Sequence, residues 1–261
     1  MMFNRNLWQR LRHVATRRIF NPKLPDILGQ TTRVHRRKYH RHDLSGLELA
    51  YALIGEQAFR ILNMSYSGLL IGRVSLEEFG GLVQKGKHLQ ITISIMGISS
   101  KISVRVVAHN KTMASLRFER VQGVEEQFLN SFLFYMDSGL LLKGLPKQNV
   151  GELYQNPSWQ SYGSVKGAIE VHLHLNSKSE VVEAHIFYLN GLRQDCALFS
   201  SRGINVTSIP ISELNSRDRR EILTHVLCIM LGLRQVGRTD RLDQFIQVGL
   251  NKLPKPLQKA S

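Results

Sequence analysis

The sequence predicts a small antiparallel β-barrel or sandwich that ends in a helix, followed by a second unit of mixed α and β structure. The chain has 261 residues, 43% apolar and 21% charged, which is enough to bury the core of one large or two modest domains. Between residues 46 and 118 apolar and polar residues alternate in successive runs, the period of half-buried strands. The same alternation begins again at residue 169.

The first unit should consist of short strands joined by turns that contain Gly or Asn. In the first strand we expect the alternating apolar face to be Leu47, Leu49, Tyr51 and Leu53. In the clearest strand the apolar face is Leu89, Ile91, Ile93 and Ile95. A helix should close the unit, because apolar residues recur every four positions after two acidic residues, at Phe128, Phe132, Met136 and Leu140.

Residues 144–167 are rich in Gly, Pro, Asn and Ser and are predicted to be a linker. Residues 168–261 should form an α+β unit that begins with a hairpin of 169–175 and 182–188. A helix is expected from an N-cap near Asn215 or Ser216 to Gly232, and a shorter one after Thr239. The segment from Leu198 to Gly203 is similar to the segment from Asn63 to Gly68, so this unit is either a degenerate copy of the first or an unrelated output domain.

The formal net charge of +15 indicates an anionic partner, and most of the excess lies near the N-terminus. Residues 1–43 contain eleven Lys and Arg against two acidic residues, and 1–35 have the pattern of a basic amphipathic arm. This arm either packs on the protein or docks on a partner or a membrane surface. No apolar run reaches the length of a spanning helix, and two cysteines suit a reducing compartment, so we expect a cytoplasmic protein that can also lie peripherally at the inner membrane.

The most informative residues form two short groups. Arg36, Arg37 and Arg41 are followed, 22 residues after Arg41, by the stretch Asn63, Ser65 and Gly68. Arginine binds phosphate or a guanine edge bidentately and stacks on bases. Asn63 and Ser65 lie two apart near the end of a strand, so both should point to one face, beside a turn that Gly68 permits. Together these groups suit a purine nucleotide that carries phosphates.

The pair R-x-x-x-R (Arg37, Arg41) and N-x-S-x-x-G (Asn63, Ser65, Gly68) resembles the PilZ domain, over about residues 33–142. The resemblance implies a six-stranded antiparallel barrel with a closing helix, over 36–143, that binds cyclic di-GMP and catalyses nothing. It implies that the arginines hold guanine and phosphate while Asn63, Ser65 and Gly68 hold the other side. Arg36, directly before the motif, is similar to that of family members that accept two stacked nucleotides.

On this interpretation the chain is a bacterial receptor whose ligand orders the arginine-rich arm and so changes contacts with a protein partner, through the arm or the C-terminal unit. The resemblance implies control of motility, adhesion, secretion or exopolysaccharide. The alternative is a nucleic-acid-binding transcriptional regulator that uses its basic residues on phosphates, and this regulator could itself respond to cyclic di-GMP. A third reading is a structural or assembly protein whose barrel binds no nucleotide.

Signals for an enzyme are weak, and we expect no catalytic residue, metal or cofactor. The pairs His40 and His42, and His172 and His174, could each place two imidazoles on one strand face, but neither has a third ligand nearby in sequence. Cys196 and Cys228 lie in no motif that indicates a nucleophile.

Overall fold

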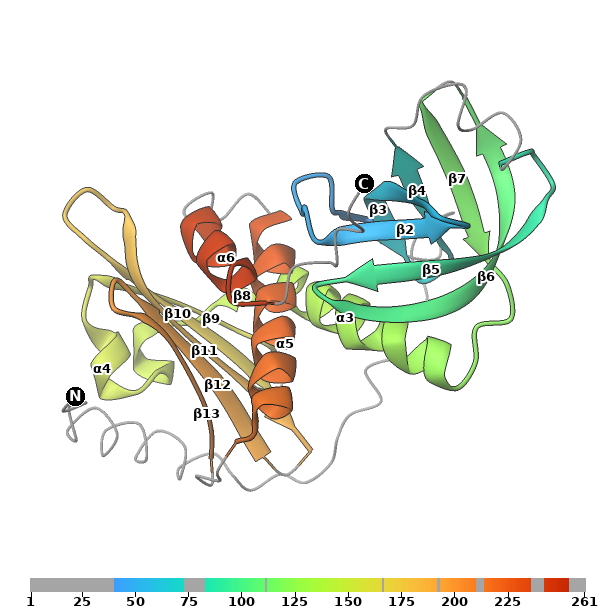
Figure 1. Ribbon diagram of the computed structural model, residues 1–261. Coiled ribbons are helices and arrows are strands. Elements are labelled where there is room, and N and C mark those ends of the chain that lie inside the picture. Colours follow the sequence, from blue (N-terminus) through green and yellow to red (C-terminus); the bar gives the residue numbers. More distant parts are fainter. Residues whose placement is uncertain are drawn as a thin grey trace. The chain divides into compact units, whose positions relative to one another are not determined.

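The computed structural model describes residues 40–72, 83–110, 112–165, 167–191, 193–209, 214–235 and 242–253 (Figure 1). The predicted basic arm, 1–35, lies outside these residues. The chain divides into two units, one containing residues 39–141 and 224–261, the barrel unit, and the other containing 142–223, the sheet unit. Within the described residues, no helix combines the length and the apolar character needed to cross a bilayer.

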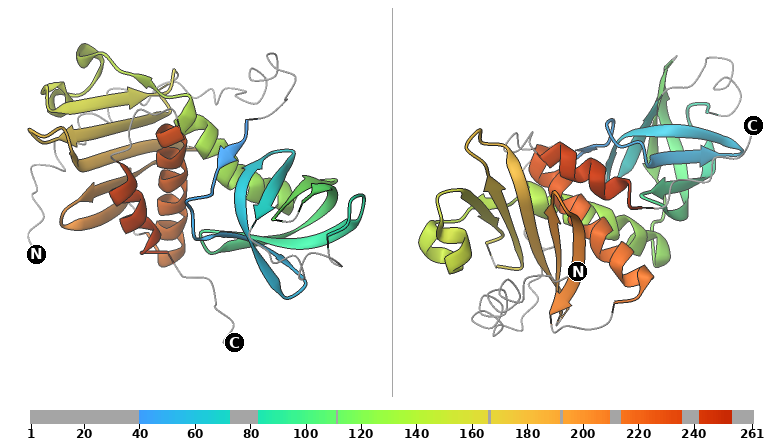
Figure 2. Two further views of the ribbon diagram at one scale, coloured as in Figure 1. Left: turned by 90° about the horizontal axis from the view of Figure 1, so that it is seen from above. Right: turned by 60° about the vertical axis from the view of Figure 1, so that its left-hand side comes forward.

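The barrel unit contains a closed barrel of six antiparallel strands, as predicted (Figures 1 and 2). Its strands are β2 (Ala50–Ile54), β3 (Gln57–Ser65), β4 (Gly68–Gly72), β5 (His88–Ile95), β6 (Ile98–His109) and β7 (Met113–Phe118). The strand order is β3-β2-β5-β6-β7-β4, and pairing of β4 with β3 closes the ring. A two-residue strand, β1 (His42–Asp43), adds to the outer side of β3.

Alternation along the strands fills the barrel with apolar side chains. Ile91, Ile93 and Ile95 of β5 are buried, as the sequence predicts. The expected phase of β2 is wrong: Ala50, Ala52 and Ile54 are buried, whereas Tyr51 and Leu53 are only partly buried. Apolar residues occupy both faces of this strand, and it is the small alanines that pack inside the barrel, so size rather than hydropathy decides which face points inward.

The predicted closing helix is α3 (Val124–Leu140), and it buries Phe128, Phe132 and Met136. It packs on α5 (Ser216–Gln235), with a glycine on each helix at the crossing. A Cβ on Gly139 would overlap the carbonyl oxygen of Ile229, and a Cβ on Gly232 would overlap that of Met136. The helices therefore touch backbone to backbone. The sequence predicts that this helix ends at Gly232, but α5 continues to Gln235, and this glycine permits the close contact with α3.

The sheet unit contains an open antiparallel sheet whose strands follow one another in chain order. They are β8 (Lys143–Gly144), β9 (Trp159–Gly163), β10 (Ile169–Leu175), β11 (Val181–Asn190), β12 (Arg193–Ser200) and β13 (Gly203–Ile209). The expected hairpin of 169–175 and 182–188 is present as β10 and β11. This open order does not repeat the closed topology of the barrel, and so does not support the hypothesis of a degenerate copy.

Residues 144–167, predicted to be a linker, contribute to the sheet unit. They contain η2 (Lys147–Asn149), α4 (Glu152–Gln155) and β9. The Lys147 ammonium donates to the carbonyl oxygens of Tyr154, Asn156 and Trp159, and Tyr154 and Trp159 are buried. Aromatic anchors and a lysine that satisfies carbonyl groups give this Gly- and Pro-rich stretch a fixed structure.

The helices after the sheet agree with their predicted start signals where these are described. The Asn215 side chain accepts a hydrogen bond from the backbone N–H of Asp218 at 2.9 Å, so Asn215 caps α5. The second helix is α6 (Asp243–Leu250), while its predicted cap, Thr239, lies outside the described residues. The division between the two units falls within α5, after Leu223, so the residues from Thr224 onward group with the barrel and not with the predicted C-terminal unit.

Candidate functional site

The described part of the arginine motif, Arg41, lies next to the strand that carries Asn63 and Ser65. Strand β1 pairs with β3 in the register His42 to Met64 and Asp43 to Asn63. Arg41, which is exposed, immediately precedes β1 and therefore lies beside the Ser65 end of β3. Arg36 and Arg37 lie outside the described residues. The part of the arginine motif that the structure describes is thus adjacent to Asn63 and Ser65.

A β-bulge in β3 sets the direction of Asn63 and Ser65. Ile61 pairs with Ile71 and Asn63 with Leu70, so Leu62 is the extra residue. Before the bulge the odd-numbered Phe59 and Ile61 point into the core, and after it the even-numbered Met64 does. Asn63 and Ser65 are therefore directed to the outer face, as the motif requires, although simple alternation from Ile61 would direct Asn63 inward.

Ser65 and Gly68 shape the hairpin that joins β3 to β4. Ser65 is buried, and its Oγ lies 3.1 Å from Ser67 Oγ and accepts a hydrogen bond from the Ser67 N–H at 3.4 Å. At Gly68, an added Cβ would overlap the carbonyl oxygen of Leu116 on β7 and lie 3.0 Å from the Cα of Arg117. Both residues therefore have a structural task, whether or not a ligand is present.

Asn63 differs from them. Its side chain is half-buried and, within the described part of the chain, has no hydrogen-bond partner. An amide offers two donors and an acceptor, so Asn63 is the motif residue of β3 best able to bind a ligand directly.

The same kind of turn occurs in the sheet unit, where it lacks the other parts of the site. Ser200 pairs with Gly203, and the Arg202 N–H donates to Ser200 Oγ at 3.2 Å. The position equivalent to Asn63 is Leu198, which is buried. In this chain the S-x-x-G half of the motif therefore serves to form a tight hairpin. The asparagine and the arginines are the part of the motif that distinguishes the candidate site from an ordinary turn.

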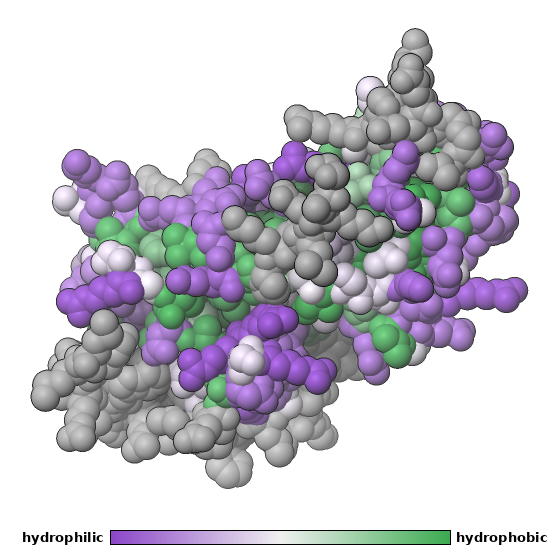
Figure 3. Space-filling model, viewed as in Figure 1, coloured by the Kyte–Doolittle hydropathy of each residue, from purple (hydrophilic) through white to green (hydrophobic). Residues whose placement is uncertain are grey.

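Sequence reasoning missed two arginines that lie in line with the motif. Gly68 pairs with Arg117 of β7, and Arg117 pairs with Arg105 of β6. Both arginines are exposed. Strand alternation in the sequence gives their outward direction, but only the strand order and register show that they continue from Gly68. In Figure 3, hydrophilic residues line much of the described outer edge of the barrel unit.

The predicted histidine pairs have structural surroundings. His42 is buried, and its Nε2 lies 2.8 Å from Asp137 Oδ1 on α3, which ties β1 to the closing helix. In the sheet unit, His172 is buried, its Nδ1 lies 2.9 Å from Ser161 Oγ, and its ring stacks on Tyr154 with centroids 3.6 Å apart. Among the described residues, no group of three or more His, Cys, Asp or Glu is arranged to hold a metal ion.

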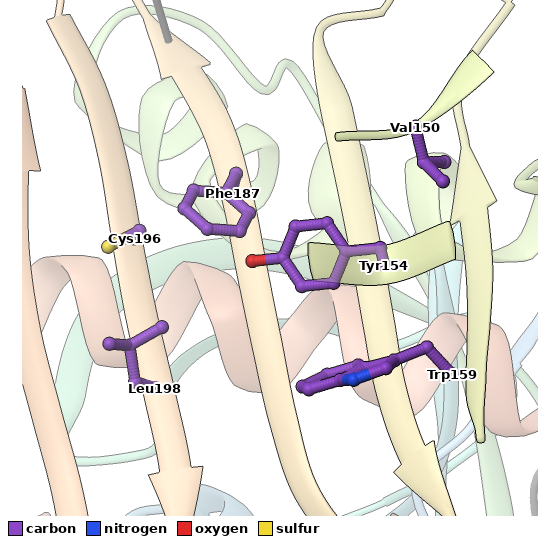
Figure 4. Close-up of a cluster of buried hydrophobic side chains, with 6 residues drawn as sticks. All are labelled: Val150, Tyr154, Trp159, Phe187, Cys196 and Leu198. Atoms are coloured by element: carbon purple, nitrogen blue, oxygen red, sulfur yellow. The ribbon is translucent and has the colours of Figure 1, made fainter. Parts of the chain in front are cut away.

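Tyr154 lies at the centre of a buried cluster with Val150, Trp159, Phe187, Cys196 and Leu198 (Figure 4). Its hydroxyl lies 2.9 Å from His185 Nδ1, and His185 Nε2 lies 2.8 Å from Glu183 Oε1. Burial raises the pKa of Tyr154 and lowers that of His172, so both favour their neutral forms. Burial also raises the pKa of Cys196 to about 12, which leaves it a thiol rather than a nucleophilic thiolate.

The barrel unit is thus a closed six-stranded barrel with polar and basic residues on one part of its outer face. Comparison with solved structures finds similarity to the PilZ domain with c-di-GMP of YcgR from Escherichia coli. That similarity has 19% sequence identity and a TM-score of 0.32, and it covers 38% of this chain and 90% of the other. No protein-family model matches the sequence, and no curated protein matches it significantly.

Proposed function

We propose that this chain is a non-enzymatic receptor for cyclic di-GMP that binds its ligand on the outer face of the barrel. Arg36, Arg37 and Arg41 hold phosphate and guanine from one side. Asn63 contacts the ligand from β3. Ser65 and Gly68 have small side chains or none, so the hairpin that joins β3 to β4 does not block the approach of the ligand.

The observation that supports this proposal best is the pairing of β1 with the Asn63 end of β3. It places Arg41 at the Ser65 end of β3, two residues along that strand from the half-buried amide of Asn63, although Arg41 and Asn63 are 22 positions apart in the sequence. A cation on one strand and an amide on its neighbour offer an anionic purine nucleotide both charge and hydrogen bonds.

Isothermal titration calorimetry of the full chain with cyclic di-GMP tests the proposal. We expect saturable binding by the wild type, and an affinity lowered roughly 10- to 100-fold in Arg37→Ala, Arg41→Ala and Asn63→Ala, because hydrogen bonds to charged groups contribute about 1.5–3 kcal/mol each. The exposed Arg220 of α5 provides a matched control, since Arg220→Ala removes an equal charge from the sheet unit. Absence of binding by the wild type at physiological salt would refute the proposal.

Ligand binding then changes how the N-terminal residues contact a protein partner. Arg36, Arg37, Lys38 and Arg41 place four positive charges within six residues, and their mutual repulsion is relieved by a dianionic ligand. Protection of residues 1–41 against limited proteolysis should therefore increase with cyclic di-GMP in the wild type and not in Arg37→Ala. If protection of the ligand-saturated wild type does not change, the proposed switching step is refuted and the binding proposal stands.

The alternative, a nucleic-acid-binding regulator, predicts a different titration. Binding to duplex DNA through several phosphates would weaken steeply as salt is raised, because counterions are released. A weak response that does not change with salt would remove this alternative.

A further inference from the structure

Five residues form one continuous cross-strand row on the outer face of the barrel. Successive register pairs join Ser65 to Gly68, Gly68 to Arg117, Arg117 to Arg105, and Arg105 to His88, across β3, β4, β7, β6 and β5. We call this set the outer row. Arg41 lies at its Ser65 end, because the register of β1 on β3 continues in that direction. The outer row therefore begins at the proposed site.

The two arginines of the outer row face each other, and no ion pair joins either of them to an acidic side chain among the described residues. Arg105 and Arg117 are direct partners on adjacent strands, and like charges in this arrangement repel one another. Neither has an ion pair with another described residue, and the nearby Glu119 carboxylate lies 2.7 Å from His88 Nδ1. Such a pair is more stable when an anion lies against it.

Between Arg41 and the two arginines, the outer row contains only Ser65 and Gly68, so no large side chain of the row lies between the two cationic ends. Gly68 has no side chain, and Ser65 is small and turned into its hairpin. Neighbouring strands are about 4.8 Å apart, so Arg117 is only about 10 Å from the Ser65 strand. A ligand lying on Gly68 would thus have Arg41 on one side and Arg117 on the other.

We propose that Arg117 and Arg105 form a second anion-binding side of the same site, and that they contact a phosphodiester group of the cyclic dinucleotide across Gly68. This inference rests on the proposed function, and it adds to the motif two residues that no part of the motif contains. It also assigns Gly68 a second task, which is to leave the path between the two cationic sides open.

Calorimetry with cyclic di-GMP on Arg117→Ala, Arg105→Ala and Lys101→Ala tests the inference. Lys101 is the matched control, since it is an exposed cation on the same face of β6, opposite Thr92 and outside the outer row. Affinity should fall roughly 10- to 100-fold in Arg117→Ala, fall in Arg105→Ala, and stay unchanged in Lys101→Ala. The thermal midpoint of the ligand-free arginine variants should stay equal or rise, because each substitution removes a repulsive partner.

The outcomes separate the two proposals. If the wild type binds, Arg41→Ala binds weakly and both outer-row variants bind as the wild type does, the second anion-binding side is refuted while the receptor proposal stands. If the lysine control loses as much affinity as Arg117→Ala, the effect is one of net charge and the assignment of these two residues is also refuted. If the wild type binds no cyclic di-GMP, both proposals fail together.

Discussion

Replacing Gly68 by alanine should destabilise the barrel even when no ligand is present. The added Cβ would overlap the Leu116 carbonyl oxygen and lie 3.0 Å from the Cα of Arg117, so β4 and β7 must separate locally. Separation weakens one or two backbone hydrogen bonds near this point, at about 1 kcal/mol each, and adds overpacking strain of about 1–3 kcal/mol. We expect the free energy of unfolding to fall by about 2–5 kcal/mol, a large part of the typical stability of a domain.

Hydrogen exchange with mass spectrometry measures this effect where it arises. Peptides that contain Gly68–Gly72 and Met113–Phe118 should lose protection in Gly68→Ala, and urea denaturation followed by circular dichroism should give a lower midpoint. The control is Gly144→Ala in β8, where a Cβ would meet no heavy atom within 4 Å. If Gly68→Ala binds no cyclic di-GMP but unfolds within about 0.5 kcal/mol of the wild type, the close approach to β7 is not the reason for the glycine.

Three further predictions concern packing, a buried carboxylate and pH. Gly139→Ala and Gly232→Ala should each lower the free energy of unfolding, because overpacking costs about 1–3 kcal/mol and the better helix propensity of alanine returns at most about 1 kcal/mol. The thermal midpoint should fall accordingly, and an unchanged midpoint would contradict the backbone contact of α3 with α5. Asp195 is buried, accepts a hydrogen bond from Ser208 Oγ at 2.6 Å and forms an ion pair with Arg193. In urea denaturation, Asp195→Ala should lower the free energy of unfolding by about 2–4 kcal/mol, and Asp195→Asn by less, because asparagine keeps an acceptor oxygen. Equal losses in the two variants would show that the missing acceptor is not the cause. Burial lowers the pKa of His172 below its ordinary 6.5, so the unfolded chain takes up that proton first and stability falls as pH drops below about 6.5. His172→Gln should flatten this part of the pH profile of stability, and an equally steep profile would show that other groups cause the slope.

The alternation of apolar residues was sufficient to predict a small antiparallel barrel or sandwich, because residues such as Ile91, Ile93 and Ile95 have one buried face and polar neighbours. The closed six-stranded form was an expectation from the resemblance to the PilZ domain. It failed for β2, where both faces are apolar and the choice depends on the width of the barrel at Ala50 and Ala52. Residues 144–167 were mistaken for a linker, because Gly and Pro mark turns whether or not anchors such as Tyr154 and Trp159 are buried.

The candidate site was only partly predictable for a related reason. Asn63, Ser65 and Arg41 could be selected because their types and spacing fit one chemistry. Arg105 and Arg117 could not, since their proximity to Gly68 depends on which strands become neighbours and in which register. Register between strands distant in sequence is set by the closed barrel as a whole and leaves no local signal in either strand.

The bulge at Leu62 makes the length of β3 as important as its composition. Deleting that one residue would restore strict alternation, and Asn63 and Ser65 would exchange places with Met64 between the outer face and the core. A polar amide would then be buried and a methionine exposed, although no side chain of the motif had been altered. Point substitutions in β3 thus test the proposed binding or the packing separately, whereas a single-residue deletion there would disturb both at once.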